Sequence, residues 1–270
     1  MYFKVNNMNI NFNKIVNKLL KKRWKIIFKK DIAEICNPDN TWAYSTSLNK
    51  VIYQLRSQKY IIVLKSWVYV IPSHDDLALN WIDLREKYFT QLLKKTITFY
   101  VWSEYYISWE KSLQMYMKNY SIPEKIYVVT RSLSKRIWVG EKCIIFKTVS
   151  GRQYGKKINL YNKFSSFTQN LSFEWVTMKF SRLEMALMES ALIHDCEEWC
   201  DIGLLVQAIK KYRSIFDIFV FQELGKYKYI MAVNRLKEIS KPLDLQLYSV
   251  FLEIIKQNGS CFIGEGGRNI

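Results

Sequence analysis

The chain has 270 residues, 49% of them hydrophobic, and carries a formal net charge of +17. This length allows one small and one medium-sized domain, and the hydrophobic share excludes a disordered polycation. No apolar run reaches the roughly 18 residues of a membrane helix, and residues 1–11 are rich in Asn without an apolar core segment. We therefore expect no membrane span and no signal peptide, and we expect the protein in the cytoplasm.

The positive charge is unevenly distributed along the chain. Residues 1–73 contain thirteen Lys or Arg and three Asp or Glu, a net charge of +10, which leaves +7 for residues 74–270. Concentrated positive charge on a small domain favours a polyanionic partner such as nucleic acid. The frequent Asn, Ile, Tyr and Lys also indicate an AT-rich genome, which explains part of the excess but not its asymmetry.

Three stretches near the N-terminus have helical spacing: residues 11–28, 29–36 and 45–58. Their apolar faces consist of Ile15, Val16, Leu19 and Leu20, then Ile32, Ala33 and Ile35, then Leu48, Val51, Ile52 and Leu55. A turn is expected at 37–40, because Asn and Asp tolerate a left-handed backbone and Pro38 cannot continue a helix. Two β-type runs follow at 60–64 and 68–71, and Pro72 ends the second.

This order of helix, short helix, turn, helix and hairpin predicts a winged helix-turn-helix over residues 1–73, with the third helix in the DNA major groove. Seven polar side chains of this region form the predicted contact set. The candidates for reading bases are Ser47, Asn49, Lys50 and Gln54, and those for holding phosphates are Arg56, Lys59 and Lys65. Two other readings stay open: a helical domain with a solvated polar face, and a winged helix that contacts only protein.

The remaining chain predicts a larger mixed α/β domain over residues 74–260, followed by a loose tail at 261–270, so the fold class is α/β of the α+β kind. Helices are expected at 77–95, 109–120, 201–212, 215–224, 226–238 and 243–257, and strands at 97–101, 126–130, 137–139, 143–149 and 177–180. Ser181 and Glu184 have the spacing of a capping box at the start of a further helix.

No set of residues predicts an active site, a cofactor or a metal centre. The two histidines, His74 and His194, lack partners at catalytic spacing, and no glycine-rich phosphate loop precedes a helix. Cys196 and Cys200, beside His194, have the spacing of zinc ligands on one helical turn, but the second half of such a site is missing. We therefore expect no enzyme, although a nucleic-acid-processing enzyme with scattered carboxylates stays an alternative.

Three segments of the second domain resemble motifs of a known family. Residues 105–113 (YYISWEKSL) resemble a YYISGxxAL pattern, residues 122–130 (IPEKIYVVT) resemble the strand that follows it, and residues 180–189 (FSRLEMALME) resemble a later SxxExALxE helix. Together they are similar to the AbiEi family, the antitoxins of type IV toxin–antitoxin systems in abortive phage defence. The likeness spans roughly residues 11–200 in the family's order.

The resemblance implies a function for each domain. The N-terminal domain is expected to bind inverted repeats in its own double-stranded promoter DNA and to repress the operon. The C-terminal domain is expected to neutralise a cognate toxin of the nucleotidyltransferase type. A general winged-helix transcriptional regulator without a toxin partner is the alternative.

Two tryptophans depart from the family pattern, which has glycine at the wing tip and after Ile-Ser, where this chain has Trp67 and Trp109. Glycine suits a hairpin turn that needs positive φ, whereas tryptophan there is costly. The chain has nine tryptophans, and Trp24 and Trp102 also stand where a small residue would serve. These positions suggest the hypothesis that UGA encodes glycine in the source organism and is written here as tryptophan.

Overall fold

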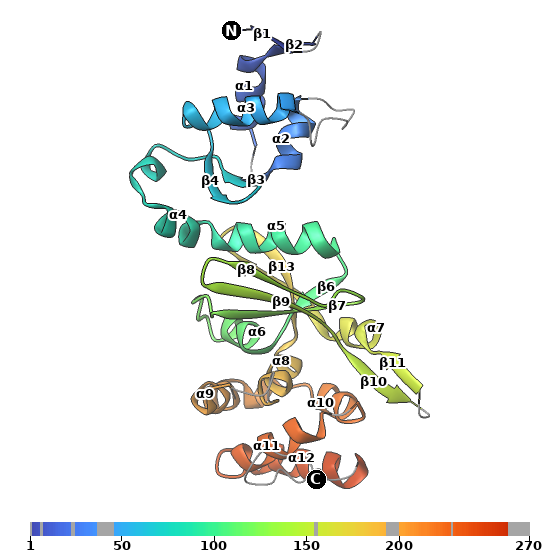
Figure 1. Cartoon of the computed structure of the whole chain (residues 1–270). Coiled ribbons are helices and arrows are strands. Elements are labelled where there is room, and N and C mark those ends of the chain that lie inside the picture. Colours follow the sequence, from blue (N-terminus) through green and yellow to red (C-terminus); the bar gives the residue numbers. More distant parts are fainter. Residues whose placement is uncertain are drawn as a thin grey trace. The chain divides into compact units, whose positions relative to one another are not determined.

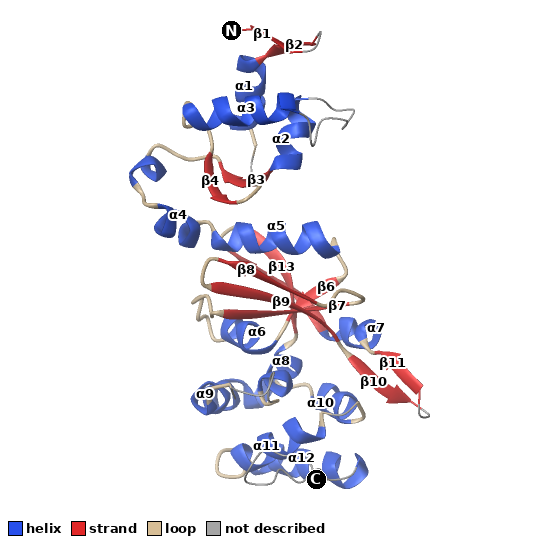
Figure 2. Ribbon diagram, viewed as in Figure 1, coloured by secondary structure: helices blue, strands red, loops and turns tan. Residues whose placement is uncertain are grey.

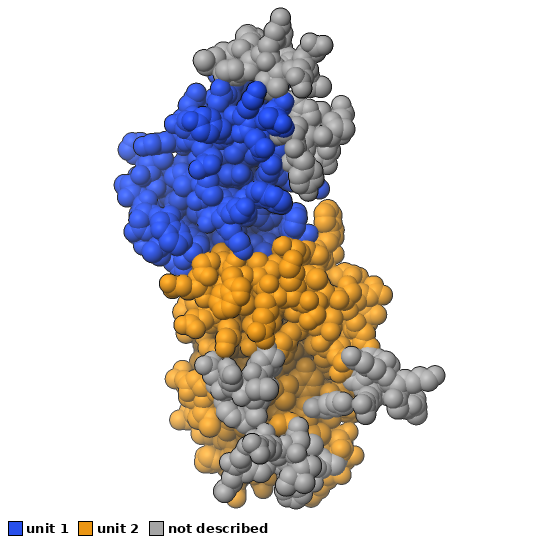
Figure 3. Space-filling model, in the orientation of Figure 1, with its two compact units in different colours: residues 1–99 blue, residues 100–270 orange. Residues whose placement is uncertain are grey.

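The computed structural model describes residues 2–5, 8–22, 25–36, 46–153, 156–192, 200–227 and 229–258. The chain divides into two compact units, residues 1–99 and 100–270 (Figure 3). Helices and strands occur in both units, which confirms the mixed α/β fold class (Figures 1 and 2). The domain bounds expected from the sequence, 1–73 and 74–260, place the division earlier in the chain.

The first unit combines a small sheet with three short helices. Its elements up to the hairpin are β1 (Tyr2–Val5), β2 (Met8–Asn11), α1 (Phe12–Leu20), β3 (Ile26–Phe28), α2 (Lys29–Cys36), α3 (Thr46–Ser57), β4 (Ile62–Lys65) and β5 (Val68–Val70). β1 pairs with β2, and β5 lies between β3 and β4 in an antiparallel three-stranded sheet. The turn expected at 37–40 lies outside the described residues.

Helical periodicity explains the core of the first unit. Each of α1, α2 and α3 buries the apolar face that the sequence predicts, except that Leu20 is exposed. The core cluster consists of Phe12, Ile15, Val16, Leu19, Ile27, Ile32, Ala33, Ile35, Leu48, Val51, Ile52, Leu55, Ile61, Tyr69 and Ile71. The polar faces of the three helices are left at the surface of the unit.

The expectation of one helix over residues 11–28 is wrong at its end. α1 stops at Leu20, and β3 pairs with β5 in the register Ile26↔Val70 and Phe28↔Val68. The structure favours the strand here because it buries both Ile26 and Ile27 and supplies backbone partners from β5.

The segment after the hairpin consists of three consecutive helical elements, whereas the sequence predicted one helix over residues 77–95. It forms a 3-10 turn η1 (Asp75–Ala78), α4 (Trp81–Lys87) and α5 (Phe89–Val101). The strand expected at 97–101 is therefore wrong. Thr96 and Ile97 are buried at helical spacing from Leu92 and Leu93, and the Thr98 hydroxyl donates to the Lys94 carbonyl at 2.9 Å, as β-branched threonine does inside helices.

One buried carboxylate organises the start of this segment. Asp76 is fully buried and accepts hydrogen bonds of 2.6 Å from the Ser73 backbone N–H, the Tyr88 hydroxyl and the Lys87 ammonium. Burial raises the pKa of Asp76, but the hydrogen bonds from Lys87, Tyr88 and Ser73 together outweigh it and hold the pKa well below its usual range. The ionised carboxylate thus ties the turn η1 to the junction of α4 and α5.

Replacing this carboxylate is expected to destabilise the protein. Asp76→Asn should lower the free energy of unfolding by about 2–3 kcal/mol at pH 7, because an amide cannot satisfy three donors in a buried site. The loss should shrink as the pH falls below about 4, where the unfolded aspartate takes up a proton and the folded one does not. Urea unfolding curves at several pH values measure this, and Asp75→Asn at the exposed neighbour serves as the control. Equal effects of the two variants would contradict the role of Asp76.

The second unit is built on a six-stranded mixed sheet in the order β12-β13-β6-β7-β9-β8. Its strands are β6 (Tyr105–Ile107), β7 (Lys125–Thr130), β8 (Lys135–Val139), β9 (Lys142–Thr148), β12 (Thr168–Phe173) and β13 (Val176–Ser181), and β10 (Ser150–Gln153) with β11 (Lys156–Asn159) forms a separate hairpin. β7 pairs in parallel with β9 and antiparallel with β6, which confirms the predicted interior strand at 126–130. The three-residue β6 was not predicted as a strand.

The second unit also contains helices, most of them after the sheet in the sequence. They are α6 (Trp109–Tyr116), α7 (Tyr161–Phe164), α8 (Leu183–Ser190), α9 (Ile202–Tyr212), α10 (Ile218–Gly225), α11 (Ile230–Ser240) and α12 (Leu245–Asn258). α6 contacts α8, and α9, α10 and α11 pack in turn against α8 (Figure 1). The four C-terminal helices expected from the sequence are confirmed, and α11 contacts α12 as expected. The tail at 261–270 lies outside the described residues.

The predicted capping box at Ser181 is wrong. Ser181 is the last residue of β13, and Arg182 is the residue before α8, without a side-chain cap. Glu184 instead accepts a hydrogen bond of 2.8 Å from the Asp217 backbone N–H. Ser181 belongs to the sheet and not to the helix because Thr168 of β12 pairs with it.

A buried carboxyl group lies in the core between β6 and α8. Glu189 of α8 is fully buried, accepts a hydrogen bond from the Ser108 hydroxyl, and lies 3.4 Å from the Tyr229 hydroxyl. Burial raises the pKa of Glu189 to about 8, although these hydrogen bonds favour its ionised form. At neutral pH the group is therefore mainly protonated.

This protonation predicts a stability that declines with rising pH. The contribution of neutral Glu189 is complete below its ordinary pKa of 4.5 and is lost by the time the pH has risen through about 8, because over this range the unfolded state releases the proton that the folded state keeps. Glu189→Gln, which stays neutral, should remove that part of the decline in the melting temperature between pH 5 and 9. The exposed Glu253→Gln should retain it. A decline of equal size in both variants would show that Glu189 is not its source.

Candidate nucleic-acid interface

α3 has a buried apolar face and an exposed polar face, and the exposed face is the candidate interface. The side chains of Leu48, Val51, Ile52 and Leu55 pack in the core of the first unit. The opposite side of the helix exposes Thr46, Asn49, Lys50, Tyr53, Arg56 and Ser57. A helix anchored in this way presents a fixed row of polar groups to a partner.

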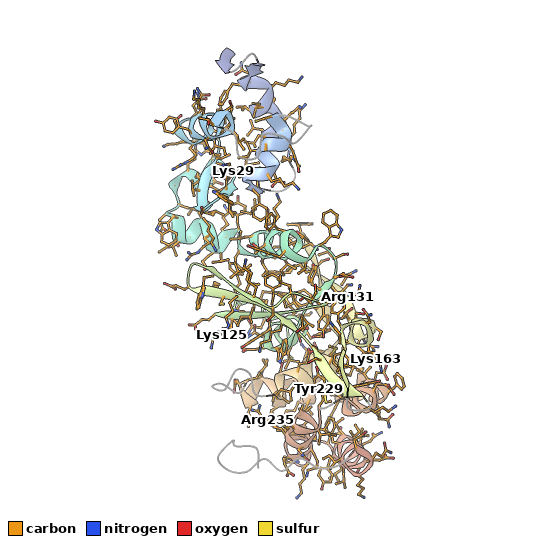
Figure 4. All side chains as sticks on the ribbon, turned by 45° about the vertical axis from the view of Figure 1, so that its right-hand side comes forward. Lys29, Lys125, Arg131, Lys163, Tyr229 and Arg235 are labelled. Carbon is orange, nitrogen blue, oxygen red and sulfur yellow. The ribbon has the colours of Figure 1, made fainter. Side chains whose placement is uncertain are left out.

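Lys29, the first residue of α2 and labelled in Figure 4, contacts both α3 and the turn of the β4–β5 hairpin. Its ammonium donates a hydrogen bond of 2.8 Å to Oδ1 of Asn49, and its backbone N–H donates to the Trp67 carbonyl at 2.9 Å. The same ammonium lies 5.8 Å from the centre of the Trp67 ring. The start of α2, the outer face of α3 and the hairpin turn are thereby held together.

The structure brings five of the seven predicted contact residues to the surface. Asn49, Lys50 and Arg56 are exposed on α3, Lys59 follows the helix, and Lys65 ends β4. Lys59 has a φ of 58° and lies in the left-handed turn that ends α3, where the Tyr60 backbone N–H donates to the Leu55 carbonyl at 2.9 Å. This turn fixes the direction in which the chain leaves the helix.

The other two predicted residues are less accessible. Gln54 is half-buried, whereas Ser47 is only 9% exposed. Ser47 lies one helical turn before Val51 and so shares its inward face. Its hydroxyl therefore faces the core side of α3 and does not belong to the exposed row.

Two residues of the surface were not selected from the sequence. Tyr53 is 70% exposed, one turn after Asn49 on the same face, and Lys29 reaches that face from α2. The i, i+4 spacing from Asn49 to Tyr53 was available in the sequence. The position of Lys29 depends on the packing of α2 against α3, which no local pattern reveals.

Each of the two carboxylates of α2 lies beside a lysine. Asp31 is paired with Lys95 and accepts a hydrogen bond of 2.6 Å from the Phe28 backbone N–H. Glu34 lies 4.0 Å from Lys30, one helical turn away. Both carboxylates of α2 thus have cationic partners outside α3.

The sequence raised the questions of a metal site and of a membrane helix. The described residues provide no support for either. Within these ranges no group of three or more His, Cys, Asp or Glu is arranged to hold a metal ion. His194 and Cys196 lie outside them, and burial raises the pKa of the half-buried Cys200 thiol to about 12. Of the helices described, none has the length and apolar character needed to cross a bilayer.

Comparisons with known proteins support the fold alone. No family model and no curated protein matches the chain. Among solved structures, the RV2827C protein from Mycobacterium tuberculosis is similar in fold, with a TM-score of 0.54 at 10% sequence identity. The match covers 92% of this chain and 81% of the other, so the likeness extends over both units.

The assignment of the two faces of α3 predicts contrasting effects on stability. Tyr53→Ala should change the free energy of unfolding by no more than about 0.5 kcal/mol, because the ring is exposed. Leu48→Ala on the buried face should lower it by about 2–5 kcal/mol. Urea denaturation followed by circular dichroism measures both. A large loss from Tyr53→Ala would mean that this side chain packs in the core.

Proposed function

We propose that the first unit is a winged helix that binds duplex DNA with α3 in the major groove. The observation that carries this proposal is the exposed polar face of α3, joined through Lys29 to the β4–β5 hairpin. The order α1-β3-α2-α3-β4-β5, with β5 between β3 and β4, corresponds to that of a winged helix, in which the hairpin is the wing. The net charge of +10 over residues 1–73 supplies the attraction for phosphates.

The side chains divide into two roles by their chemistry and position. Asn49, Lys50 and Gln54 lie on or beside the exposed face of α3 and suit base edges, since Asn and Gln recognise adenine and Lys recognises guanine. The basic groups at the helix end and on the wing suit phosphates, namely Arg56, Lys59 and Lys65.

The contact with Lys29 refines the role of Asn49. An ammonium group only donates hydrogen bonds, so the Asn49 atom facing it is the carbonyl oxygen and the amide NH₂ is left to donate outward. In this arrangement Asn49 suits an acceptor such as N7 or O6 of guanine or O4 of thymine. Reading adenine with both amide atoms would require the contact with Lys29 to open.

For the whole chain we propose a cytoplasmic repressor of its own operon that is also the antitoxin of a nucleotidyltransferase-type toxin. The support is the resemblance to the AbiEi family. Its motif residues Ser108 and Glu189 are in contact in the core of the second unit, so these motifs serve the fold of that unit. A toxin would therefore have to contact other side chains, which lie on the surface of the unit.

A toxin partner distinguishes this proposal from a general transcriptional regulator. We expect a nucleotidyltransferase gene beside this one, and we expect co-expression of this chain to relieve growth arrest by that enzyme. Growth arrest that persists would contradict the antitoxin role and leave DNA binding as a separate question. Variants of α3 that lose DNA binding should still relieve the arrest if the second unit is responsible.

Substitutions on α3 and on the wing should affect DNA binding differently. The double variant Lys50→Ala with Gln54→Ala should lose preference for the promoter over random duplex, at about 1–3 kcal/mol for each lost base contact. Lys65→Ala should weaken binding to both duplexes evenly and reduce the salt slope by about 1. Fluorescence anisotropy at several salt concentrations measures affinity, preference and slope.

A matched lysine on another element controls for the loss of charge. Lys18→Ala removes an exposed lysine from α1, outside the proposed surface, and should leave the preference for the promoter unchanged. The placement of α3 against the bases is contradicted if the double variant retains full preference, or if Lys18→Ala reduces the preference as strongly.

A further inference from the structure

Four tryptophans have a backbone conformation that is typical of glycine. The φ angles are 67° at Trp67, 53° at Trp102, 57° at Trp109 and 64° at Trp175. The structure describes the backbone of only two other tryptophans, Trp81 and Trp138, and neither has a positive φ. A left-handed backbone is strained for an L-residue, and a bulky residue there is a genuine outlier.

The turn at Trp175 gives the clearest case. Phe173 of β12 pairs with Val176 of β13, so Glu174 and Trp175 form a two-residue turn with φ of 48° and 64°. Positive φ at both central residues defines a type I′ turn, in which glycine is the strongly preferred second residue. The Trp175 side chain is 94% exposed and gains almost no burial in return.

The same sheet contains a turn that already has the expected residue. Val139 of β8 pairs with Lys142 of β9, and the turn between them opens with Gly140 at a φ of 64°. The chain therefore places glycine at one left-handed hairpin position and tryptophan at another.

Trp67 and Trp102 also occupy positions that favour glycine. Trp67 is the left-handed residue of the β4–β5 turn, next to Val68, and its side chain is 59% exposed. Trp102 directly follows the last residue of α5, where a left-handed residue commonly ends a helix and is usually glycine, and it is 82% exposed. Trp109 differs in that its ring is buried and lies 5.0 Å from the ring of Tyr127.

We infer that the native protein carries glycine at positions 67, 102, 109 and 175, because the codons there are UGA and the source organism reads UGA as glycine. One reassignment accounts for all four conformations. It also accounts for the composition, since the chain has nine tryptophans and only nine glycines, about half the glycine content of an average protein (~7%). The consequence for the β4–β5 turn is that Ser66 carries its remaining side chain, between Lys65 and the glycine at position 67.

The direct test is the identity of these residues in the protein purified from its source. Tandem mass spectrometry of tryptic peptides should show glycine at 67, 102, 109 and 175, and the gene should have TGA at the matching codons. Tryptophan at any of the four positions, or a TGG codon there, overturns the inference. This outcome is independent of DNA binding.

The melting temperatures of variants test the same inference. The protein with the printed sequence, tryptophans included, is expressed for this purpose from a synthetic gene with tryptophan codons. Trp175→Gly should raise the melting temperature by about 2–4 °C, because it removes the left-handed strain at the cost of little burial. Trp175→Ala removes the ring but not the strain and should leave the melting temperature nearly unchanged. Trp138→Gly, in strand β8, should lower it, since glycine weakens a strand interior. If Trp175→Gly raises the melting temperature no more than Trp175→Ala does, the backbone does not require glycine and the inference fails.

Discussion

The packing of α3 is the constraint on which the proposed function depends. Leu48, Val51, Ile52 and Leu55 fix the inward face of the helix in the core of the first unit, and this determines which side chains point outward. Lys29 then joins that outer face to the β4–β5 turn through Asn49 and the Trp67 carbonyl. A polar row held by a buried face and a bridging lysine loses little freedom when it meets a rigid duplex, which favours affinity.

The two units rely on buried polar groups in opposite ways. Asp76 in the first unit is held ionised by three donors, whereas Glu189 in the second is held neutral by burial. The stabilisation by ionised Asp76 is lost at low pH, and that by neutral Glu189 is lost at high pH. Neither group is exposed, and both therefore act on the fold and not on a partner.

Helical periodicity predicted most of the first unit, because α1, α2 and α3 each bury one face at a spacing of three or four residues. Two three-residue strands, β3 and β6, were missed because they are too brief to show alternation, whereas the equally short β5 was predicted from a β-type run that Pro72 ends. The β-branched run at 97–101 misled the prediction because local propensity is weaker than helical packing. For the candidate site, residue type identified Asn49 and Lys50, but it also selected Ser47, whose angular position on α3 turns it inward. Lys29 depends on a contact between distant segments, which a single sequence does not contain.

The central claim is that the exposed face of α3 lies against duplex DNA. The most direct measurement places a photo-crosslinking amino acid at position 53 of the full chain and irradiates the complex with promoter duplex. We predict an efficient protein–DNA crosslink from position 53 and little from position 245, which is equally solvent-accessible on α12 (Tyr53 70% and Leu245 72% exposed). Crosslinking at 53 that is absent, or no stronger than at 245, would contradict the claim.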